Sequence, residues 1–481
     1  MDRDNETVVG RVASVVHEQP SAPAVIVQDK RYSYAELWDQ VLAWSSELRS
    51  RKAPPGTAAA LVIHDPAHLP AAFLAARRAD LVPLPIDGLM PAARCAAMIA
   101  AGRPSLVLSV GASLSIGEAH HSPTRLPAEA GYLVFSSGSQ GAPKGIIGNE
   151  RGVIHFVDWE TAALGLAAGP RVAMLSSPSF DVVLRDMLLP LFTGGVLCAA
   201  PAAVRTNPAS VLPWLAAQAV EVVHAVPSLS ARWLAAASCP LPCVTWTLFG
   251  GEPLYAEHVL AWRAAALNAS VMNVYGPSET TLARFWHVAG AEPRSGLEPV
   301  GRPVPGTILH RARISGGAVG DAFQVRLQTP DGSLGYLPGT ASETDRGRLT
   351  REDGVTGFLT QDRGRLDAQQ RLVVEGRLDS YVKRRGLLLD LAHMEHTAAA
   401  TQGVTLACGV QIMPESTGDV VLAVEARADV SPAQLRQALR KQLGVAMPDK
   451  VIVLPNLPRL PSGKVDRQQV RRILGPASAK R

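Results

Sequence analysis

The stretch from Tyr132 to Gly145 combines the residue types that hold a polyphosphate. An apolar run that reads as a strand leads into a loop of serines and glycines, and a lysine follows. Hydroxyl groups, unobstructed backbone N–H groups and one cation are what several linked phosphates require. Pro143 stands five residues after Gly138, where a Walker A loop would have Gly-Lys-Ser/Thr, so P-loop kinase and ATPase chemistry is disfavoured. The candidate phosphate-binding residues are Ser136, Ser137, Gly138, Ser139, Gly141 and Lys144.

Six further motifs follow this loop along the chain. They are Phe180-Asp181 with the apolar run 188–197, Phe249–Glu252, Asn273–Thr281, Thr360–Asp362, Gly376–Asp379 with 382–386, and Pro461–Asp466. Together with the loop, and in this order, they resemble the motifs of the adenylate-forming enzymes. That superfamily includes acyl-CoA synthetases, luciferases and the adenylation domains of nonribosomal peptide synthetases. The resemblance covers essentially the whole chain, and its closest form is a free-standing amino-acid adenylation domain.

The resemblance implies adenylation, in which a carboxylate joins the α-phosphorus of ATP while pyrophosphate leaves. Two anions must be held together, so positioning and charge neutralisation provide most of the rate. Lys464 is implied to be the catalytic residue, because an ammonium group can reach between the carboxylate and the α-phosphate. Glu279 is implied to bind Mg²⁺, a hard cation that prefers carboxylates and water. The alternative for Glu279 is a glutamate stabilised at a helix start by the dipole. ATP and Mg²⁺ are the expected cofactors.

The resemblance also implies the nucleotide contacts and a hinge. Tyr275 is expected to stack on adenine and Asn273 to hydrogen-bond its edge, while Asp362 suits the ribose hydroxyls. Asp379 is the implied hinge about which the C-terminal domain rotates, so that Lys464 leaves after the first half-reaction. The implied ATP- and AMP-binding residues are the six of the loop together with Gly251, Glu252, Asn273, Val274, Tyr275, Gly276, Ser278, Asp362 and Arg377.

A pocket for the acyl group is implied by the same motifs. In members that activate amino acids, an aspartate at the place of Asp181 pairs with the α-ammonium group of the substrate. A carboxylate here favours an amino acid over a fatty or aryl acid, because a buried unpaired aspartate is costly. The implied lining is Asp181, Val182, Arg185, Ala225, Leu248, Gly250, Val274, Leu282 and Ala283, with Lys464 closing one end.

The two charged residues of this pocket have alternative interpretations. Asp181 could instead cap the N-terminus of a helix. Arg185 follows four residues later, so on a helix the two side chains share a face and could pair with each other. The sharper hypothesis is that Arg185 meets an acidic or carbonyl-bearing group on the substrate side chain. An imino acid also remains open as the substrate.

The elements that must position these motifs predict an α/β fold. Short apolar runs at 24–28, 58–63, 81–86 and 105–110 alternate with helical stretches, a pattern typical of parallel βαβ packing, and the pattern recurs over 171–274. Segments rich in Gly and Pro over 299–377 predict a small β-barrel-like subdomain. The predicted architecture is therefore two layered α/β subdomains and this β subdomain in residues 1–378, followed by a small mobile α+β domain over 379–481.

Composition sets the protein class. The chain has 481 residues, of which 47% are hydrophobic and 19% charged, so a disordered or fibrous protein is excluded. A net charge of +5 gives little reason to expect nucleic acid as a partner. The positive charge is concentrated in 380–481, which has 15 Lys and Arg against 8 Asp and Glu. This excess indicates either a solvated basic face or a patch for an acidic partner or a phosphate.

Other sequence features concern the compartment. Five cysteines are few and odd in number, which argues against a disulfide framework. The N-terminus has no signal-peptide pattern, and no run of about 18 apolar residues is present. We therefore expect a cytoplasmic protein with no membrane partner.

The expected function is ATP-dependent activation of an amino acid as aminoacyl-AMP in natural-product biosynthesis, such as that of an antibiotic. No carrier-protein motif follows Lys464, so we expect transfer to the phosphopantetheine thiol of a separate carrier protein, whose acidic surface would suit the basic C-terminal region. One alternative is an acid:CoA or amide ligase. Another is a non-catalytic relative that binds AMP, since Gln361 replaces a glycine of the ribose motif and 308–339 departs from the family pattern.

Overall fold

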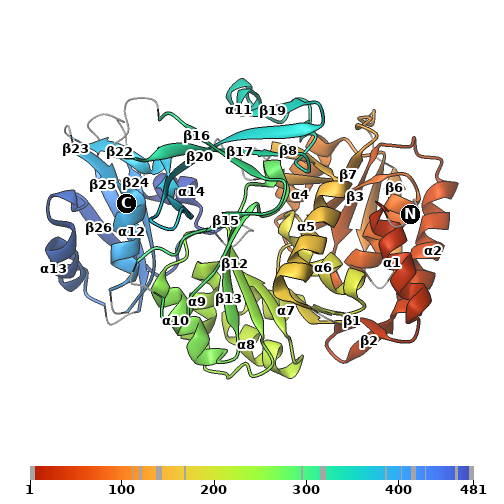
Figure 1. The fold of residues 1–481 in the computed structure, drawn as a ribbon, viewed down its shortest axis with the longest axis horizontal. Helices are drawn as coiled ribbons and strands as arrows, with labels where there is room; N and C mark the ends of the chain where they lie inside the picture. The colour runs from red at the N-terminus through yellow and green to blue at the C-terminus, as the bar shows by residue number, and fades with distance from the viewer. Residues whose placement is uncertain are drawn as a thin grey trace.

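The computed structural model, shown as a ribbon in Figure 1, places most of the chain. It describes residues 6–111, 113–118, 122–136, 144–166, 169–293, 296–314, 321–384, 387–401, 403–412, 419–427, 430–460 and 464–475.

A nine-stranded sheet forms the centre of the molecule. Its six inner strands are parallel, whereas β14, β15 and β2 run antiparallel to their neighbours. The inner strands are nearly continuous apolar runs, because helices cover both faces of a parallel sheet. In spatial order the strands are β15 (Arg302–Pro303), β14 (Phe285–Val288), β13 (Ser270–Tyr275), β12 (Trp246–Gly250), β11 (Val222–Ala225), β9 (Arg171–Met174), β10 (Val196–Ala199), β1 (Pro23–Val27) and β2 (Lys30–Ser33).

Helices pack on both faces of this sheet. One face carries α7 (Ala202–Thr206), α8 (Pro208–Ala217), α9 (Pro227–Ala236) and α10 (Ala256–Ala265). The other carries α1 (Val8–Glu18), α2 (Tyr34–Ser50), α3 (Leu69–Arg78), α5 (Glu150–Leu164) and α6 (Val182–Thr193). The start of α2 is set locally by a capping box, in which Ser33 and Glu36 exchange hydrogen bonds.

A second α/β layer lies beyond the second helix group, which is thereby packed between two sheets (Figure 1). This second sheet has the order β4 (Val82–Asp87), β3 (Ala58–Ile63), β5 (Leu106–Val110) and β6 (Leu114–Glu118), and α4 (Ala92–Gly102) covers its outer face. A three-stranded sheet of β18 (Gly335–Tyr336), β8 (Lys144–Asn149) and β7 (Ala130–Ser136) adjoins it.

The segment after β15 forms a separate antiparallel sheet. Its strands are β16 (Ile308–Ala312), β17 (Phe323–Thr329), β20 (Val355–Leu366), β19 (Leu349–Glu352) and β21 (Leu372–Arg377), with α11 (Glu343–Arg348) preceding β19. One face packs on a small apolar cluster that contains Val325 and Leu372. The strands do not close into a barrel among the described residues, so the barrel-like description applies only to the compact antiparallel sheet.

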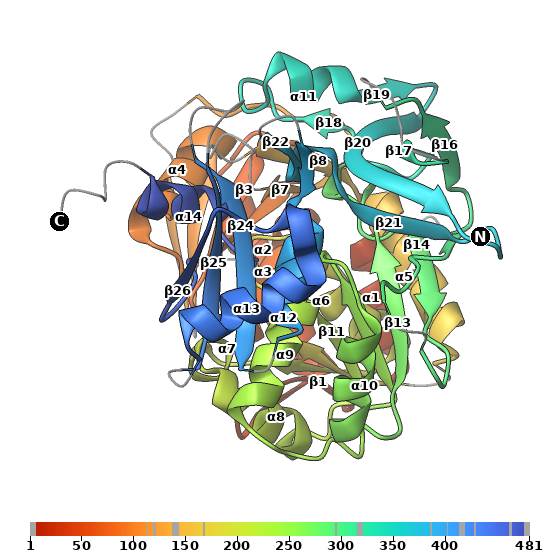
Figure 2. The same cartoon turned by 90° about the vertical axis from the view of Figure 1, so that its left-hand side faces the viewer.

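The elements from β22 to α14, called the C-terminal unit below, have an apolar core of their own. The unit contains the hairpin β22 (Tyr381–Arg384) and β23 (Leu387–Asp390), and the sheet β24 (Val404–Gln411), β25 (Val420–Ala426) and β26 (Lys450–Leu454). Its helices are α12 (Leu391–Ala399), α13 (Pro432–Leu443) and α14 (Arg467–Leu474). Figure 2 shows this unit in blue across α9 and α10, and α9 contacts β24.

The predicted fold class is confirmed, since the protein is a layered α/β structure with two helix-covered sheets, an antiparallel sheet and an α+β C-terminal unit. The apolar runs at 24–28 and 58–63 are β1 and β3, as the alternation with helices predicts. In the described part of the chain, we find no helix with the length and apolar character that a membrane span requires.

Candidate active site

The predicted site residues gather where parallel strands of the central sheet end. Ala225, Gly250 and Tyr275 are the last residues of β11, β12 and β13, three strands that are adjacent in the sheet. In an open α/β sheet, ligands bind outside the carboxyl ends of the strands, because the following loops and helices converge there. The structure therefore brings together residues that are separated by 25 positions or more in the sequence.

Lys464 reaches this edge from the C-terminal unit. A Cβ atom built on Gly251 would lie 3.2 Å from Cε and 3.4 Å from Nζ of Lys464. Gly251 has a φ of +83°, so both its backbone conformation and the lysine beside it require glycine. Lys464 also lies close enough to Asp362 to oppose the rise in the pKa of that carboxyl group.

Asp362 and Tyr275 form a half-buried pair on the nucleotide side. The Tyr275 hydroxyl donates to Oδ2 of Asp362 over 2.5 Å, and the backbone N–H of Asp362 donates to Thr360 Oγ1 over 3.0 Å. Burial raises the pKa of Asp362, while Tyr275 and Arg377 lower it. Arg377 stands opposite Asp362 in the β20–β21 ladder and makes a bidentate pair with Asp379, at 2.8 and 2.9 Å. The predicted ribose-binding residues and the predicted hinge are thus direct neighbours.

Gln361, which replaces a glycine of the family motif, does not enter this pair. Its amide oxygen lies 2.9 Å from Nε of Arg348 in the orientation that satisfies both side chains. Arg348 is the last residue of α11, so the substitution connects β20 to that helix.

Glu279 is buried and lies beside a cation and a phenol. The Tyr336 hydroxyl donates to its Oε1 over 2.7 Å. Burial raises the pKa of Glu279, and the Lys144 charge lowers it. Lys144 in turn pairs with Asp345 over 3.0 Å.

These residues fit Mg²⁺ that is shared with phosphates. Such an ion uses one or two protein carboxylates plus phosphate oxygens and water, and Glu279 supplies one carboxylate whose buried charge a cation would stabilise. The described residues contain no cluster of three or more His, Cys, Asp or Glu with metal-binding geometry, so an all-protein cage is not the arrangement here.

Asp181 points into the site rather than capping its helix. It is the N-cap residue of α6, but it has helical backbone angles and its side chain makes no capping hydrogen bond. The carboxylate interacts with the Ser278 hydroxyl and with the backbone N–H groups of Leu282 and Val182. Burial raises the pKa of Asp181, which these bonds and the Arg185 charge partly offset.

The turn that presents Leu282 to Asp181 is strained. Thr281 and Leu282 have φ values of +63° and +54°, a left-handed region that is unfavourable for a β-branched residue such as threonine. Strain of this kind persists where surrounding structure determines the backbone, and it clusters at ligand sites. It orients the Leu282 N–H toward the pocket.

Arg185 is buried, and part of its guanidinium group lacks a hydrogen-bond partner. Its residue exposure is 5%, its Nε has no hydrogen-bond partner, and no ion pair within 4.0 Å joins it to Asp181 among the described residues. The two side chains therefore make no direct ion pair, although the Arg185 charge lowers the pKa of Asp181. A donor such as this Nε is costly when it is buried without a partner, which leaves it available to a ligand.

Beneath Arg185 lies a buried charged triad that the motifs did not reveal. His224 contacts Asp186 Oδ1 at 2.8 Å and Glu160 Oε1 at 3.1 Å, and all three side chains are fully buried. Burial and Arg185 oppose protonation of His224, yet the two carboxylates outweigh them and raise its pKa. The sequence did contain a signal for this triad, because His224 stands inside the apolar run Val222–Ala225. A polar or charged residue in such a run is rarely buried without a partner.

Other predicted residues occupy varied positions. Asn273 is buried and donates its amide to the carbonyls of Glu298 and Pro299, at 3.2 and 3.0 Å, so only its oxygen remains for adenine. Glu252 accepts from the Ser228 backbone N–H at 3.2 Å. Ser136 ends β7 with a buried hydroxyl that lacks a partner. The buried pocket residues are Ala225, Leu248, Val274, Leu282 and Ala283. Val182 and Gly250 are half-buried, and Gly276, which was predicted to bind the nucleotide, is exposed. Ser137, Gly138, Ser139 and Gly141 lie outside the described residues.

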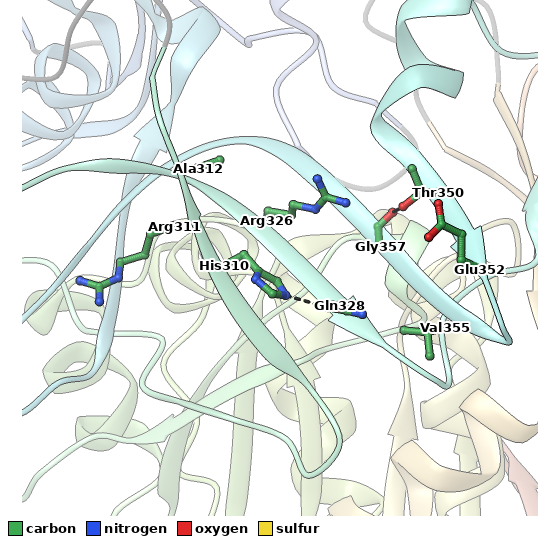
Figure 3. Close-up of a pocket in the computed structure, with 9 residues that line it drawn as sticks. All are labelled: His310, Arg311, Ala312, Arg326, Gln328, Thr350, Glu352, Val355 and Gly357. Carbon is green, nitrogen blue, oxygen red and sulfur yellow. Dashed lines mark hydrogen bonds between the residues drawn. The ribbon is translucent and has the colours of Figure 1, made fainter.

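A separate hollow of about 370 Å³ contains none of these residues. It lies on the open face of the β16–β21 sheet, where His310 bonds Gln328 and Arg326 extends toward Gly357 (Figure 3). The candidate active site is therefore identified by its charged and polar residues, and not by the volume of this hollow.

The sequence is similar to a known enzyme family and to several larger proteins. The family described as AMP-binding enzyme matches residues 12–129 and 109–311. Enterobactin synthase component F of Shigella flexneri is 27% identical over 96% of this chain and 39% of its own length. Delta-poly-L-ornithine synthetase of Acinetobacter baumannii is 25% identical over 97% of this chain and 37% of its own length. The chain thus spans about two fifths of the length of these relatives.

Solved structures share the fold. A four-domain nonribosomal peptide synthetase bound to AMP and glycine matches with a TM-score of 0.83 and 21% identity, over 97% of this chain and 36% of that one. An anthranilate CoA ligase in complex with anthranoyl-AMP matches with a TM-score of 0.82 and 18% identity, over 98% of both chains. At these identities the likeness concerns the fold alone.

Proposed function

This chain belongs to the family of AMP-binding enzymes, as an adenylation domain of the nonribosomal peptide synthetase type, and from that premise we propose that it activates an amino acid with ATP. The observation that carries the proposal is the position of Lys464 beside Gly251, close to Asp362, at the strand ends that also hold Asp181. This arrangement supports one site for a nucleotide, a carboxylate and a cation between them.

The proposed step forms one bond and breaks one. A carboxylate oxygen of the substrate attacks the α-phosphorus of ATP, and the bond from that phosphorus to the pyrophosphate oxygen breaks, giving an acyl-AMP and pyrophosphate without a proton transfer. Lys464 holds the carboxylate and the α-phosphate together and offsets the charge that develops between them. Asp362 accepts hydrogen bonds from the ribose hydroxyls, while Tyr275 is fixed by its bond to Asp362.

Glu279 and Lys144 are proposed to neutralise the negative charge of the phosphates, Glu279 through Mg²⁺ and Lys144 directly. Mg²⁺, when bound, would neutralise phosphate oxygens and be held by Glu279 with water molecules. Lys144 lies close enough to Glu279 to act on its ionisation. When phosphates enter, Lys144 exchanges its pair with Asp345 for an interaction with phosphate.

The substrate is proposed to be an amino acid because Asp181 is a buried carboxylate with no cationic partner within 4.0 Å among the described side chains. An α-ammonium group would supply that partner. Arg185, buried and unpaired, then offers a second contact to an acidic or carbonyl-bearing side chain. The negative charge of the Glu160–His224–Asp186 triad stabilises the guanidinium in its place.

We further propose residues 1–378 as the core and 379–481 as the C-terminal domain, with Asp379 as the hinge. The acyl group is proposed to pass to the phosphopantetheine thiol of a carrier protein, as the resemblance to nonribosomal peptide synthetases suggests. The basic charge of 380–481 suits an acidic carrier, so lower salt should speed the transfer.

The test is exchange of labelled pyrophosphate into ATP over a panel of proteinogenic and nonproteinogenic amino acids, with benzoate and a fatty acid as controls. Exchange that depends on an amino acid and falls to a small residual rate in Lys464→Ala is the expected result, whereas exchange that persists at the wild-type rate in Lys464→Ala contradicts the catalytic role. Arg185→Ala should change the preference among amino acids. Acyl transfer to CoA without a carrier would assign an acid:CoA ligase instead, and no exchange with any acid would favour a non-catalytic AMP-binding protein.

A further inference from the structure

The segment that leads to Lys464 begins at a hydrogen bond with one buried carboxylate of the C-terminal unit. Glu425, near the end of β25, is 7% exposed. Its Oε2 accepts from the Leu457 backbone N–H over 2.9 Å, just after the chain leaves β26. Glu425 therefore holds the start of the segment that leads to Lys464.

The two ends of the turn that contains Lys464 are joined by backbone hydrogen bonds. Arg459 and Val465 form an isolated antiparallel bridge, and the Leu460 N–H donates to the Lys464 carbonyl over 2.7 Å. The Arg459 guanidinium lies 3.7 Å from Glu425 Oε2. Because backbone bonds close the turn at both ends, a displacement at Glu425 is passed on to Lys464.

Glu425 is also bound to the core. Arg232 on α9 places Nε 3.8 Å from Glu425 Oε1, and the side chains are 27% and 10% exposed. Ion pairs with this much burial are less screened than surface pairs. The same carboxylate thus contacts α9 of the core through one oxygen and the lysine-bearing segment through the other.

Arg459 of the C-terminal unit also interacts with a carboxylate of the core, that of Glu252. Burial and the Arg232 charge lower the pKa of Arg459. The carboxylates of Glu425 and Glu252 oppose that change, so charges on both sides of the contact act on Arg459. Glu252 is next to Gly251, the residue against which Lys464 lies, and the N-terminus of α9 holds it through Ser228.

A second contact supports the same orientation of the C-terminal unit. The Tyr255 and His396 rings stack with centroids 3.5 Å apart at 10°, and His396 Nδ1 lies 3.4 Å from Glu257 Oε1. Tyr255 and Glu257 belong to the start of α10, and His396 to α12. Contacts at α9 and α10 together define how the unit rests on the core (Figure 2).

We infer that Arg232, Glu425 and Arg459 are positioning residues that seat Lys464 against Gly251 for the adenylation step. None of the three needs to touch substrate, since each acts through the lysine. The inference rests on the proposed function for its kinetic consequence, but the seating of the lysine itself can be measured without catalysis.

The first experiment measures the accessibility of Lys464. The full chain is reductively methylated for a short time, and the modification of each lysine is quantified by mass spectrometry. Arg232→Gln removes the core charge from a partly exposed site, so it should fold, and it is expected to raise the modification of Lys464 several-fold. Lys450, whose side chain is 64% exposed, serves as the internal control and should be unchanged.

A control variant, Arg51→Gln, and a second test variant, Glu425→Gln, accompany this measurement. Arg51→Gln breaks an exposed pair with Glu47 on α2, far along the chain from the site, and should leave Lys464 as in the wild type. Glu425→Gln keeps an acceptor for the Leu457 N–H but loses the charge, and should act like Arg232→Gln. Unchanged modification of Lys464 in both Arg232→Gln and Glu425→Gln would overturn the inference, whatever their activity.

The second experiment is kinetic. Arg232→Gln is expected to lower the pyrophosphate exchange rate roughly tenfold, which is about 1.4 kcal/mol, and to have no further effect in a Lys464→Ala background, since it acts through that lysine. An equal loss in both backgrounds would show a merely structural role. If the wild type exchanges pyrophosphate with no acid, the proposed function fails, while the methylation result still decides the seating of Lys464.

Discussion

Gly251→Ala is the most direct perturbation of the arrangement between Lys464 and the strand ends. The added methyl group would lie 3.2 Å from Cε and 3.4 Å from Nζ of Lys464. Carbon atoms in ordinary contact are about 3.5–4.0 Å apart, so the ammonium group must move away by a few tenths of an ångström. Since a misplacement of about 1 Å can lower a rate roughly hundredfold, we expect pyrophosphate exchange to fall about tenfold.

The substitution also strains the backbone. Gly251 has a φ of +83°, and a left-handed conformation costs a residue with a side chain roughly 1–2 kcal/mol. Gly354→Ala is the matched control, because Gly354 has a φ of +79° and no atom within 4 Å of the added methyl group. Both variants should lose similar free energy of unfolding in urea, but only Gly251→Ala should lose exchange activity.

Two results would refute this reasoning. Wild-type exchange in Gly251→Ala would mean that Lys464 does not act from the position described here. An equal loss in Gly354→Ala would mean that activity follows global stability. A Lys464→Ala background adds a further check, since Gly251→Ala should then have no additional effect on the residual rate.

Three further predictions concern buried charges. Asp181→Asn should abolish amino-acid activation, yet it should raise the stability of the free protein at neutral pH by about 1 kcal/mol. Because burial raises the pKa of Asp181, the ionised carboxylate of the wild type costs stability as pH rises through that pKa. The stability gain over the wild type, measured by urea denaturation, should therefore vanish at low pH, where the wild-type carboxyl is protonated. His224→Leu leaves two buried carboxylates without their cation and should lower the free energy of unfolding by roughly 3–5 kcal/mol, as measured by urea denaturation; a loss below about 1 kcal/mol would contradict the triad. Glu279→Gln should retain the Tyr336 hydrogen bond but shift half-maximal exchange to higher Mg²⁺, and an unchanged magnesium titration would contradict its role as a ligand.

Much of the fold was predictable from the sequence because its signals are local. The apolar runs that became β1, β3 and β5 alternate with helical stretches, and that alternation is typical of parallel sheets. The antiparallel sheet over β16–β21 was predicted as a barrel-like unit. Closure depends on pairing between the first and last strands, which no local pattern encodes, and the described strands do not close.

The candidate site was predictable only in part. Motif order indicated Lys464, Glu279 and Asp362, whose roles stay predictions. Sequence spacing left Asp181 with a helix-cap alternative and a pairing alternative with Arg185, both of which are plausible for residues four apart. In the structure Asp181 stands at the N-cap position without a capping hydrogen bond and makes no ion pair within 4.0 Å with Arg185 among the described side chains, because burial and the strained turn at Leu282 determine where the carboxylate points.

By itself, then, the sequence determined the family and the layered α/β architecture, since motifs and periodicity act over a few neighbouring residues. The residues that it indicates for ATP and a carboxylate stay predictions. Only the tertiary structure decided which charges meet. The His224 triad joins residues up to 64 positions apart, and the Arg232–Glu425 contact joins residues of the core and the C-terminal unit. Contacts between such distant residues depend on how whole elements pack, because the energy of a charge is set by its burial and its neighbours in space.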